Sequence, residues 1–68
     1  MTHESAIAYC NGALAIAGLP SLDADDCALL RDPAADPEQV DGLLETLHRC
    51  GAHLSSANAD AIRNFYSR

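Results

Sequence analysis

The chain contains no lysine and no tryptophan, and four arginines are its only residues with a permanent positive charge. Ten acidic residues outnumber them, so the formal net charge is −6 at pH 7 and the sequence pI is about 4.5. The phosphate backbone of nucleic acids and the surface of anionic membranes both repel a protein of this charge. The sequence therefore predicts no direct nucleic-acid binding and no membrane binding, and favours a protein partner with a basic surface.

A long apolar run is also missing. The longest strongly apolar stretch, Ala13–Leu19, is much shorter than the roughly 20 residues that a helix needs to cross a bilayer. Near the N-terminus, Cys10, Asn11 and Gly12 interrupt the apolar residues and no basic region precedes them, so we expect no secretory signal. Three cysteines, an odd number, suit reduced thiols better than a disulfide framework. These features predict a cytoplasmic protein.

No catalytic motif is apparent. His53, Ser55, Ser56 and Asp60 include the residue types of a nucleophile, a base and an orienting acid. Each of them, however, occupies a position that suits helix capping or solvent exposure. A chain of 68 residues also leaves little room for a substrate pocket. We therefore expect a protein that is not an enzyme and that uses no cofactor.

Five side chains are candidate metal ligands, namely Cys10, Cys27, Cys50, His48 and His53. The usual spacing of two residues between paired thiols is absent. Each cysteine also lies beside leucine or isoleucine on an apolar helix face, where a free cysteine behaves as a small hydrophobic residue. The sequence predicts no metal site, and zinc held by some of these five side chains is the alternative.

No stretch alternates apolar and polar residues for long enough to predict a strand, whereas four segments have helical spacing and helix-end signals. The expected helices span about residues 3–18, 24–31 and 37–50, and a fourth starts at Ser55 or Ser56. The third is the clearest, because Asp36-Pro37 is a helix start and Gly51 is a helix end. Its apolar residues recur at helical spacing and are Val40, Leu43, Leu44, Leu47 and Cys50.

These elements predict one all-α domain over residues 1–68, a small three- to four-helix bundle. Its core is thin, since thirteen of the apolar residues are alanines and a chain this short buries only about 60% of its unfolded surface. A second copy of the chain could complete the core by dimerisation. Within the first helix, Gly12 marks either a close helix contact or a bend.

Acidic residues are concentrated between Leu22 and Leu47, where Arg31 is the only base. The eight acids are Asp23, Asp25, Asp26, Asp32, Asp36, Glu38, Asp41 and Glu45. Three explanations fit such a segment: it keeps the protein soluble, it steers the protein onto a basic partner, or its carboxylates imitate the phosphates of a nucleic acid. Asp41 and Glu45 have no capping role, which makes them the clearest candidates for a partner contact.

We therefore predict a small acidic binding protein that inhibits or regulates a partner protein. Its composition is similar in general terms to that of phage-encoded inhibitors and antitoxins. The predicted partner-binding residues are Asp23, Asp25, Asp26, Asp41, Glu45 and Tyr66. The alternative is a structural or interaction module that homodimerises through apolar helix faces. The antitoxins of Fic-type toxins carry Ser or Thr, three residues, then Glu-Gly, but the corresponding stretch here, Ala13–Gly18, lacks both inhibitory side chains.

Overall fold

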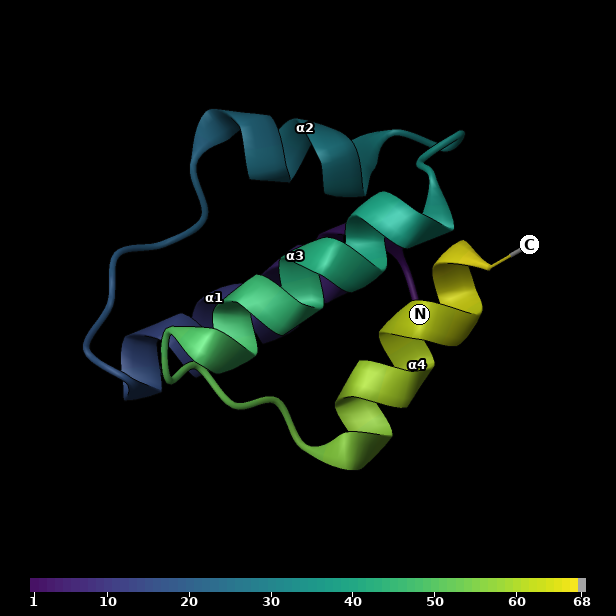
Figure 1. Ribbon diagram of the computed structural model, residues 1–68. Coiled ribbons are helices and arrows are strands. Elements are labelled where there is room, and N and C mark those ends of the chain that lie inside the picture. The colour runs from purple at the N-terminus through teal and green to yellow at the C-terminus, as the bar shows by residue number, and fades with distance from the viewer. Residues whose placement is uncertain (68) are drawn as a thin grey trace.

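The computed structural model describes residues 1–67, which fold into four helices and contain no strand (Figure 1). The helices are α1 (His3–Ile16), α2 (Ala24–Arg31), α3 (Pro37–Arg49) and α4 (Ser56–Tyr66). The predicted all-α fold is confirmed. The first and third expected helices end slightly too late, because α1 stops at Ile16 and α3 at Arg49. Arg68, a base that from the sequence suits the C-terminal end of the fourth helix, lies outside the described residues.

Each helix begins at a side chain that accepts a hydrogen bond from a backbone N–H group in its first turn. The N-cap residues are Thr2, Asp23, Asp36 and Ser55. Thr2 and Ser5 form a reciprocal capping box. Such caps stabilise a helix by about 1 kcal/mol each, a considerable contribution for short helices such as α2. Glycine ends two helices, since Gly18 and Gly51 have φ angles of 73° and 95°.

The α2 helix lies across the top of the view in Figure 1 and packs against both α1 and α3. The α4 helix packs against α3, and its last residues, Phe65 and Tyr66, lie beside His3 at the start of α1. Within residues 1–67 no helix is long and apolar enough to span a membrane.

All four helices contribute to one apolar core. The largest side chains that are fully buried come one from each helix: Cys10, Leu30, Val40 and Ile62. The predicted stripe on α3 is inside, with Val40, Leu43, Leu44 and Leu47 buried, whereas Cys50 is exposed. The described residues include no buried charged or polar side chain.

The Leu30 carbonyl group connects three parts of the chain. It accepts hydrogen bonds from the His3 Nδ1–H group at 2.9 Å and from the Tyr66 hydroxyl group. Because a carbonyl oxygen has two lone pairs, both bonds can form at once. The start of α1, the end of α2 and the end of α4 are therefore fixed next to one another.

Gly12 does not mark a close helix contact, which was the first of its two expected roles. A Cβ atom built on Gly12 would meet nothing within 4 Å, and the same is true of Gly42 on α3. Both glycines are exposed and lie inside continuous helices. They therefore reduce helix stability, and neither makes a close contact that only glycine would allow.

Replacing Gly42 should stabilise the fold. Gly42→Ala should raise the free energy of unfolding by about 0.5–1 kcal/mol, because alanine loses less backbone entropy in a helix and has open space here. Urea denaturation followed by circular dichroism measures this. Gly51→Ala is the matched control and should destabilise by about 1–2 kcal/mol, since its φ of 95° is strained for alanine. A loss of stability in Gly42→Ala would contradict the open space that the structure shows around this residue.

Candidate functional site

The acidic residues fall into two groups according to whether an arginine neutralises them. The ion pairs are Glu4–Arg31 (2.8 Å), Asp41–Arg63 (2.6 Å), Asp60–Arg63 (3.7 Å) and Glu45–Arg49 (3.8 Å). Four of the ten acids are thus paired, and they occupy every arginine within residues 1–67. The remaining six have no basic partner among those residues.

Asp41 and Glu45 cap no helix, as expected, but each has a basic partner within the fold. Both are exposed as expected, but Asp41 connects α3 to α4 through Arg63, which lies 22 positions further along the chain. Glu45 faces Arg49 one helical turn away. The Glu45–Arg49 spacing of four residues was visible in the sequence and is a known helix-stabilising pair, whereas the pair between helices depends on the tertiary fold.

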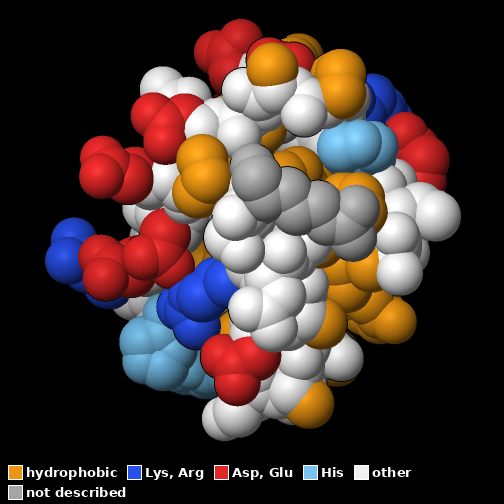
Figure 2. Space-filling view, turned by 90° about the vertical axis from the view of Figure 1, so that its right-hand side faces the viewer, with side chains coloured by type: hydrophobic (Ala, Val, Ile, Leu, Met, Phe, Trp, Pro, Cys, Tyr) orange, Lys and Arg blue, Asp and Glu red, His pale blue; other side chains and the backbone are white. Residues whose placement is uncertain are grey.

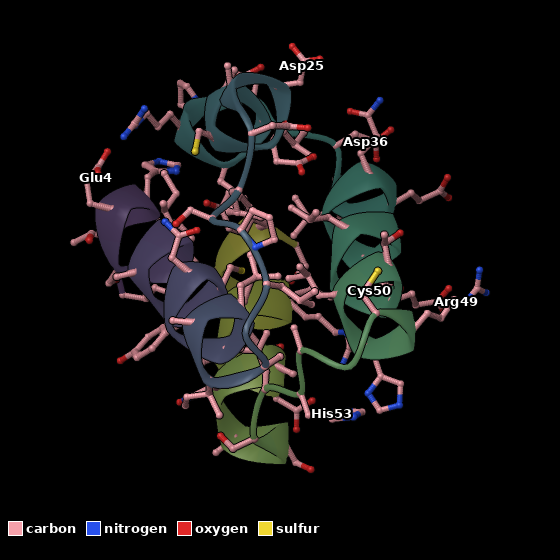
Figure 3. The ribbon with its side chains drawn as sticks, turned by 90° about the vertical axis from the view of Figure 1, so that its left-hand side faces the viewer. Glu4, Asp25, Asp36, Arg49, Cys50 and His53 are labelled. Atoms are coloured by element: carbon pink, nitrogen blue, oxygen red, sulfur yellow. The ribbon has the colours of Figure 1, made fainter. Side chains whose placement is uncertain are left out.

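The six unpaired acids form what we call the acidic surface, which runs from the N-cap of α2 through the connector between α2 and α3 to the first turn of α3. Its members are Asp23, Asp25, Asp26, Asp32, Asp36 and Glu38. Asp26 is half-buried and the other five are exposed. Asp25 and Asp36 point away from the bundle in Figure 3. In Figure 2, acidic side chains form a broken band along the top and left of the view, with basic ones joining at the lower left.

Three of these carboxylates are fixed by the backbone. Asp23 accepts the Asp26 N–H at 2.8 Å, Asp32 accepts the Ala34 N–H at 2.9 Å, and Asp36 accepts the Glu38 N–H at 2.9 Å. These bonds account for part of the acidic composition without any partner. They also hold the negative charges in defined positions, so a ligand that binds there would not have to order flexible side chains.

Like charges crowd one another at the start of α2. Burial raises the pKa of the Asp26 carboxyl group above its ordinary value. Three smaller effects raise it further: the charge of Asp23, a hydrogen bond with Asp23, and the charge of Asp25. The charged form of Asp26 is therefore disfavoured in the folded protein. A positive group brought to this surface would relieve that repulsion.

Removing one of these neighbours should change the titration of Asp26. Asp23→Asn keeps a good N-cap but removes a charge, so the pKa of Asp26 should fall. Because the pKa of Asp26 is raised in the folded state, its contribution to the free energy of unfolding grows as pH falls through that pKa. In Asp23→Asn this pH-dependent gain in stability should be smaller. Side-chain carboxyl NMR titration measures it. Asp32→Asn is the control, and an unchanged Asp26 pKa in Asp23→Asn would contradict the explanation.

A cavity of about 390 Å³ opens beside the connector. It is lined by His3, Pro33, Ala34, Ala35, Asp36, Pro37, Phe65 and Tyr66. Three of these residues form an edge-to-face ring cluster, with centroid separations of 5.0 Å for His3–Phe65, 5.7 Å for His3–Tyr66 and 5.0 Å for Phe65–Tyr66. Sequence patterns do not indicate this cavity, because its walls come from three distant parts of the chain.

The predicted contact residue Tyr66 is only 7% exposed, and its hydroxyl group is bonded to the Leu30 carbonyl. Burial also raises the pKa of that hydroxyl. Tyr66 therefore contributes to the core, and it also lines this cavity. Phe65 packs against the core from a half-buried position.

The candidate metal ligands are mostly apart. His48 and His53 come together at the end of α3, with 2.9 Å between their Nδ1 atoms, beside an α3–α4 groove of about 590 Å³. Cys10 is in the core, where burial raises the pKa of its thiol to about 11, while Cys27 is half-buried and Cys50 exposed. Among residues 1–67, no three histidine, cysteine or acidic side chains converge as metal ligands.

The α3–α4 groove combines opposite charges. Arg49 and Arg63 line it together with Glu45 and Asp60, and these four side chains pair with one another or with Asp41. The groove therefore has little net charge to attract an ionic ligand. The strongest uncompensated charge lies at the other end of α3, on the acidic surface.

Comparison with known proteins identifies no relative: no family model, no curated protein and no solved structure matches the chain. Any function must therefore be argued from the residues themselves.

Proposed function

We propose that this chain is a small non-enzymatic binding protein that inhibits or regulates a partner protein by covering a basic surface of that partner. The observation that carries the proposal is the distribution of unpaired charge. Six acids without a basic partner lie between Asp23 and Glu38, while the paired acids lie on α1, α3 and α4. Three of the six have local hydrogen bonds to the backbone, but all six add to one concentrated negative charge over α2, the connector and the first turn of α3.

Electrostatics explains how such a surface would act. Long-range attraction speeds the encounter with a basic partner, and like-charge repulsion rejects acidic ones. Where the basic surface of the partner normally holds a nucleic acid, the row of carboxylates would occupy the positions of phosphates and mask the site. Inhibition then needs no chemistry, only occupancy.

The test uses an eight-residue arginine peptide as the basic probe. Isothermal titration should find binding at about 20 mM salt and an affinity at least tenfold lower at about 300 mM salt, because exposed charges are screened. Binding that is absent at low salt, or equally strong at both salt concentrations, would overturn the proposal. A neutral peptide of eight glutamines is the control and should not bind.

The apolar outer face of α1 favours a second candidate function, a module that pairs with a second copy of itself. Residues 5–22 carry no charge, and two large apolar side chains on α1 are exposed, Ile16 at 92% and Tyr9 at 42%. Two copies with a net charge of −6 can approach through an uncharged face without opposing carboxylates. An antiparallel crossing at Gly12 would place Ile16 against Ala8 of the second copy.

Cysteine cross-linking tests this pairing. In a Cys50→Ser background, Gly12→Cys should form a disulfide-linked dimer under mild oxidation, because the crossing brings the two copies of residue 12 together. Gly42→Cys in the same background is the matched control, since both glycines are exposed with open space around them. Equal cross-linking at both positions, or none at residue 12, would reject the dimer.

A further inference from the structure

We infer that the cavity beside the acidic surface receives an arginine side chain of the basic partner. The inference rests on the proposed function and identifies the kind of residue that the partner presents. Three parts of the chain build the cavity: the start of α1, the connector between α2 and α3, and the end of α4. His3 of α1 and Tyr66 of α4 both bond to the Leu30 carbonyl near the end of α2, just before the connector. These bonds hold the walls in place, so the cavity exists before any ligand arrives.

The hydrogen-bonding groups on the cavity wall are mostly acceptors or already engaged. Tyr66 donates its hydroxyl hydrogen to the Leu30 carbonyl. His3 must carry its proton on Nδ1, because that atom bonds to the same carbonyl oxygen, so Nε2 of the neutral ring is an acceptor. Asp36 uses one carboxylate oxygen for the Glu38 N–H group, and no side chain or backbone group of residues 1–67 donates to the other.

The backbone of the connector offers few donors to the cavity. Pro33 and Pro37 have no N–H group. The N–H groups of Ala34 and Ala35 are bonded to the Asp32 side chain and to the Asp32 carbonyl, at 2.9 and 3.1 Å. A ligand that fits this wall must therefore bring donors of its own.

Charge and ring geometry favour a cation. Asp36 lines the cavity and has no basic partner among the described residues, and the neighbouring Asp32 has none either. Aromatic faces attract cations, by about 0.5–1 kcal/mol at exposed sites. The cavity combines a carboxylate with three rings, which is the chemistry of a site for a positively charged side chain.

Arginine matches these features better than lysine does. Its guanidinium group has five donors and no acceptor, lies flat against aromatic rings, and is less strongly hydrated than an ammonium group. A volume of about 390 Å³ is at the lower end of the range for small-ligand pockets, which suits a single side chain with water. Arginine is also enriched among the residues that dominate interface energies.

The test uses Nα-acetyl-arginine-N-methylamide as the probe and NMR to follow the ring protons of His3, Phe65 and Tyr66. All three rings should shift with a dissociation constant in the millimolar range, as expected for one side chain. The citrulline analogue has nearly the same shape without the charge and should bind at least fivefold more weakly. Rings that do not shift, or equal binding of both probes, would overturn the inference.

Two variants and one control locate the binding. Asp36→Asn keeps an N-cap and Phe65→Leu keeps apolar bulk, and each should weaken binding of the arginine probe about fivefold to tenfold. Asp25→Asn removes a charge from the same surface outside the cavity and should leave the affinity within twofold. If Phe65→Leu does not fold, Asp36→Asn decides alone. Equal losses in Asp25→Asn and Asp36→Asn would overturn the inference.

The octa-arginine titration separates this inference from the proposed function. Salt-dependent binding of the peptide without ring shifts from the arginine probe would overturn the cavity site and leave the acidic surface supported. Failure of both measurements would overturn both. Ring shifts that disappear in Asp36→Asn, together with peptide binding, would support the cavity as the arginine site.

Discussion

Ile62→Ala should unfold much of the protein under conditions in which Ile16→Ala leaves it folded. Ile62 is fully buried between α4 and the rest of the core, whereas Ile16 is 92% exposed at the end of α1. Truncating a buried isoleucine costs about 2–5 kcal/mol, and a domain of this length has a total stability of only about 3–10 kcal/mol. One cavity can therefore remove most of the stability.

Urea denaturation followed by circular dichroism compares the two variants. The midpoint of Ile62→Ala should fall sharply or be lost, and that of Ile16→Ala should change by the equivalent of less than about 0.5 kcal/mol. The same chemical change is made in both, so the difference reports burial alone. Equal destabilisation would mean that Ile16 is also covered, which in solution would point to a second copy on α1.

The second large effect concerns the acidic surface. A triple variant that neutralises three unpaired acids, Asp25→Asn, Asp32→Asn and Glu38→Gln, should bind the octa-arginine peptide about tenfold more weakly at low salt. The estimate follows from about 0.5 kcal/mol for each exposed charge, and 1.4 kcal/mol is a factor of ten in affinity. Asparagine at residue 32 can keep the hydrogen bond to the Ala34 N–H group, so the connector should stay in place.

A charge-matched variant supplies the control. Asp41→Asn, Glu45→Gln and Asp60→Asn also change the net charge from −6 to −3, but all three acids are ion-paired on α3 and α4. Its affinity for the peptide should change by less than about threefold. If the two triple variants weaken binding equally, only net charge matters and the acidic surface is not a site.

Local signals were sufficient to predict the helices. Asp36 is the N-cap of α3, as the Asp36-Pro37 pair indicated, and Gly51 ends α3 with the positive φ that a terminal glycine allows. These features are set by residues within one or two turns of each other. Because these signals are local, the sequence predicts the number and order of the helices but not how they pack.

The site depended on contacts that are distant in sequence. Asp41 appeared to be a free charge because its partner Arg63 lies on another helix. The sequence predicts Tyr66 as a contact residue but does not indicate that its hydroxyl group bonds to Leu30, 36 positions earlier. The unpaired acids are less numerous than the sequence suggested, because Asp41 and Glu45 on α3 are ion-paired. The proposed contact therefore keeps the predicted acids of α2 and extends to the connector and the first turn of α3.

The most direct test of the acidic surface is backbone amide NMR during titration with the octa-arginine peptide at low salt. The amides from Asp23 to Glu38 should show the largest chemical-shift changes, while those from Asp41 to Arg49 should change little. The largest changes along α3, or small and even changes over the whole chain, would show that the peptide does not recognise the acidic surface.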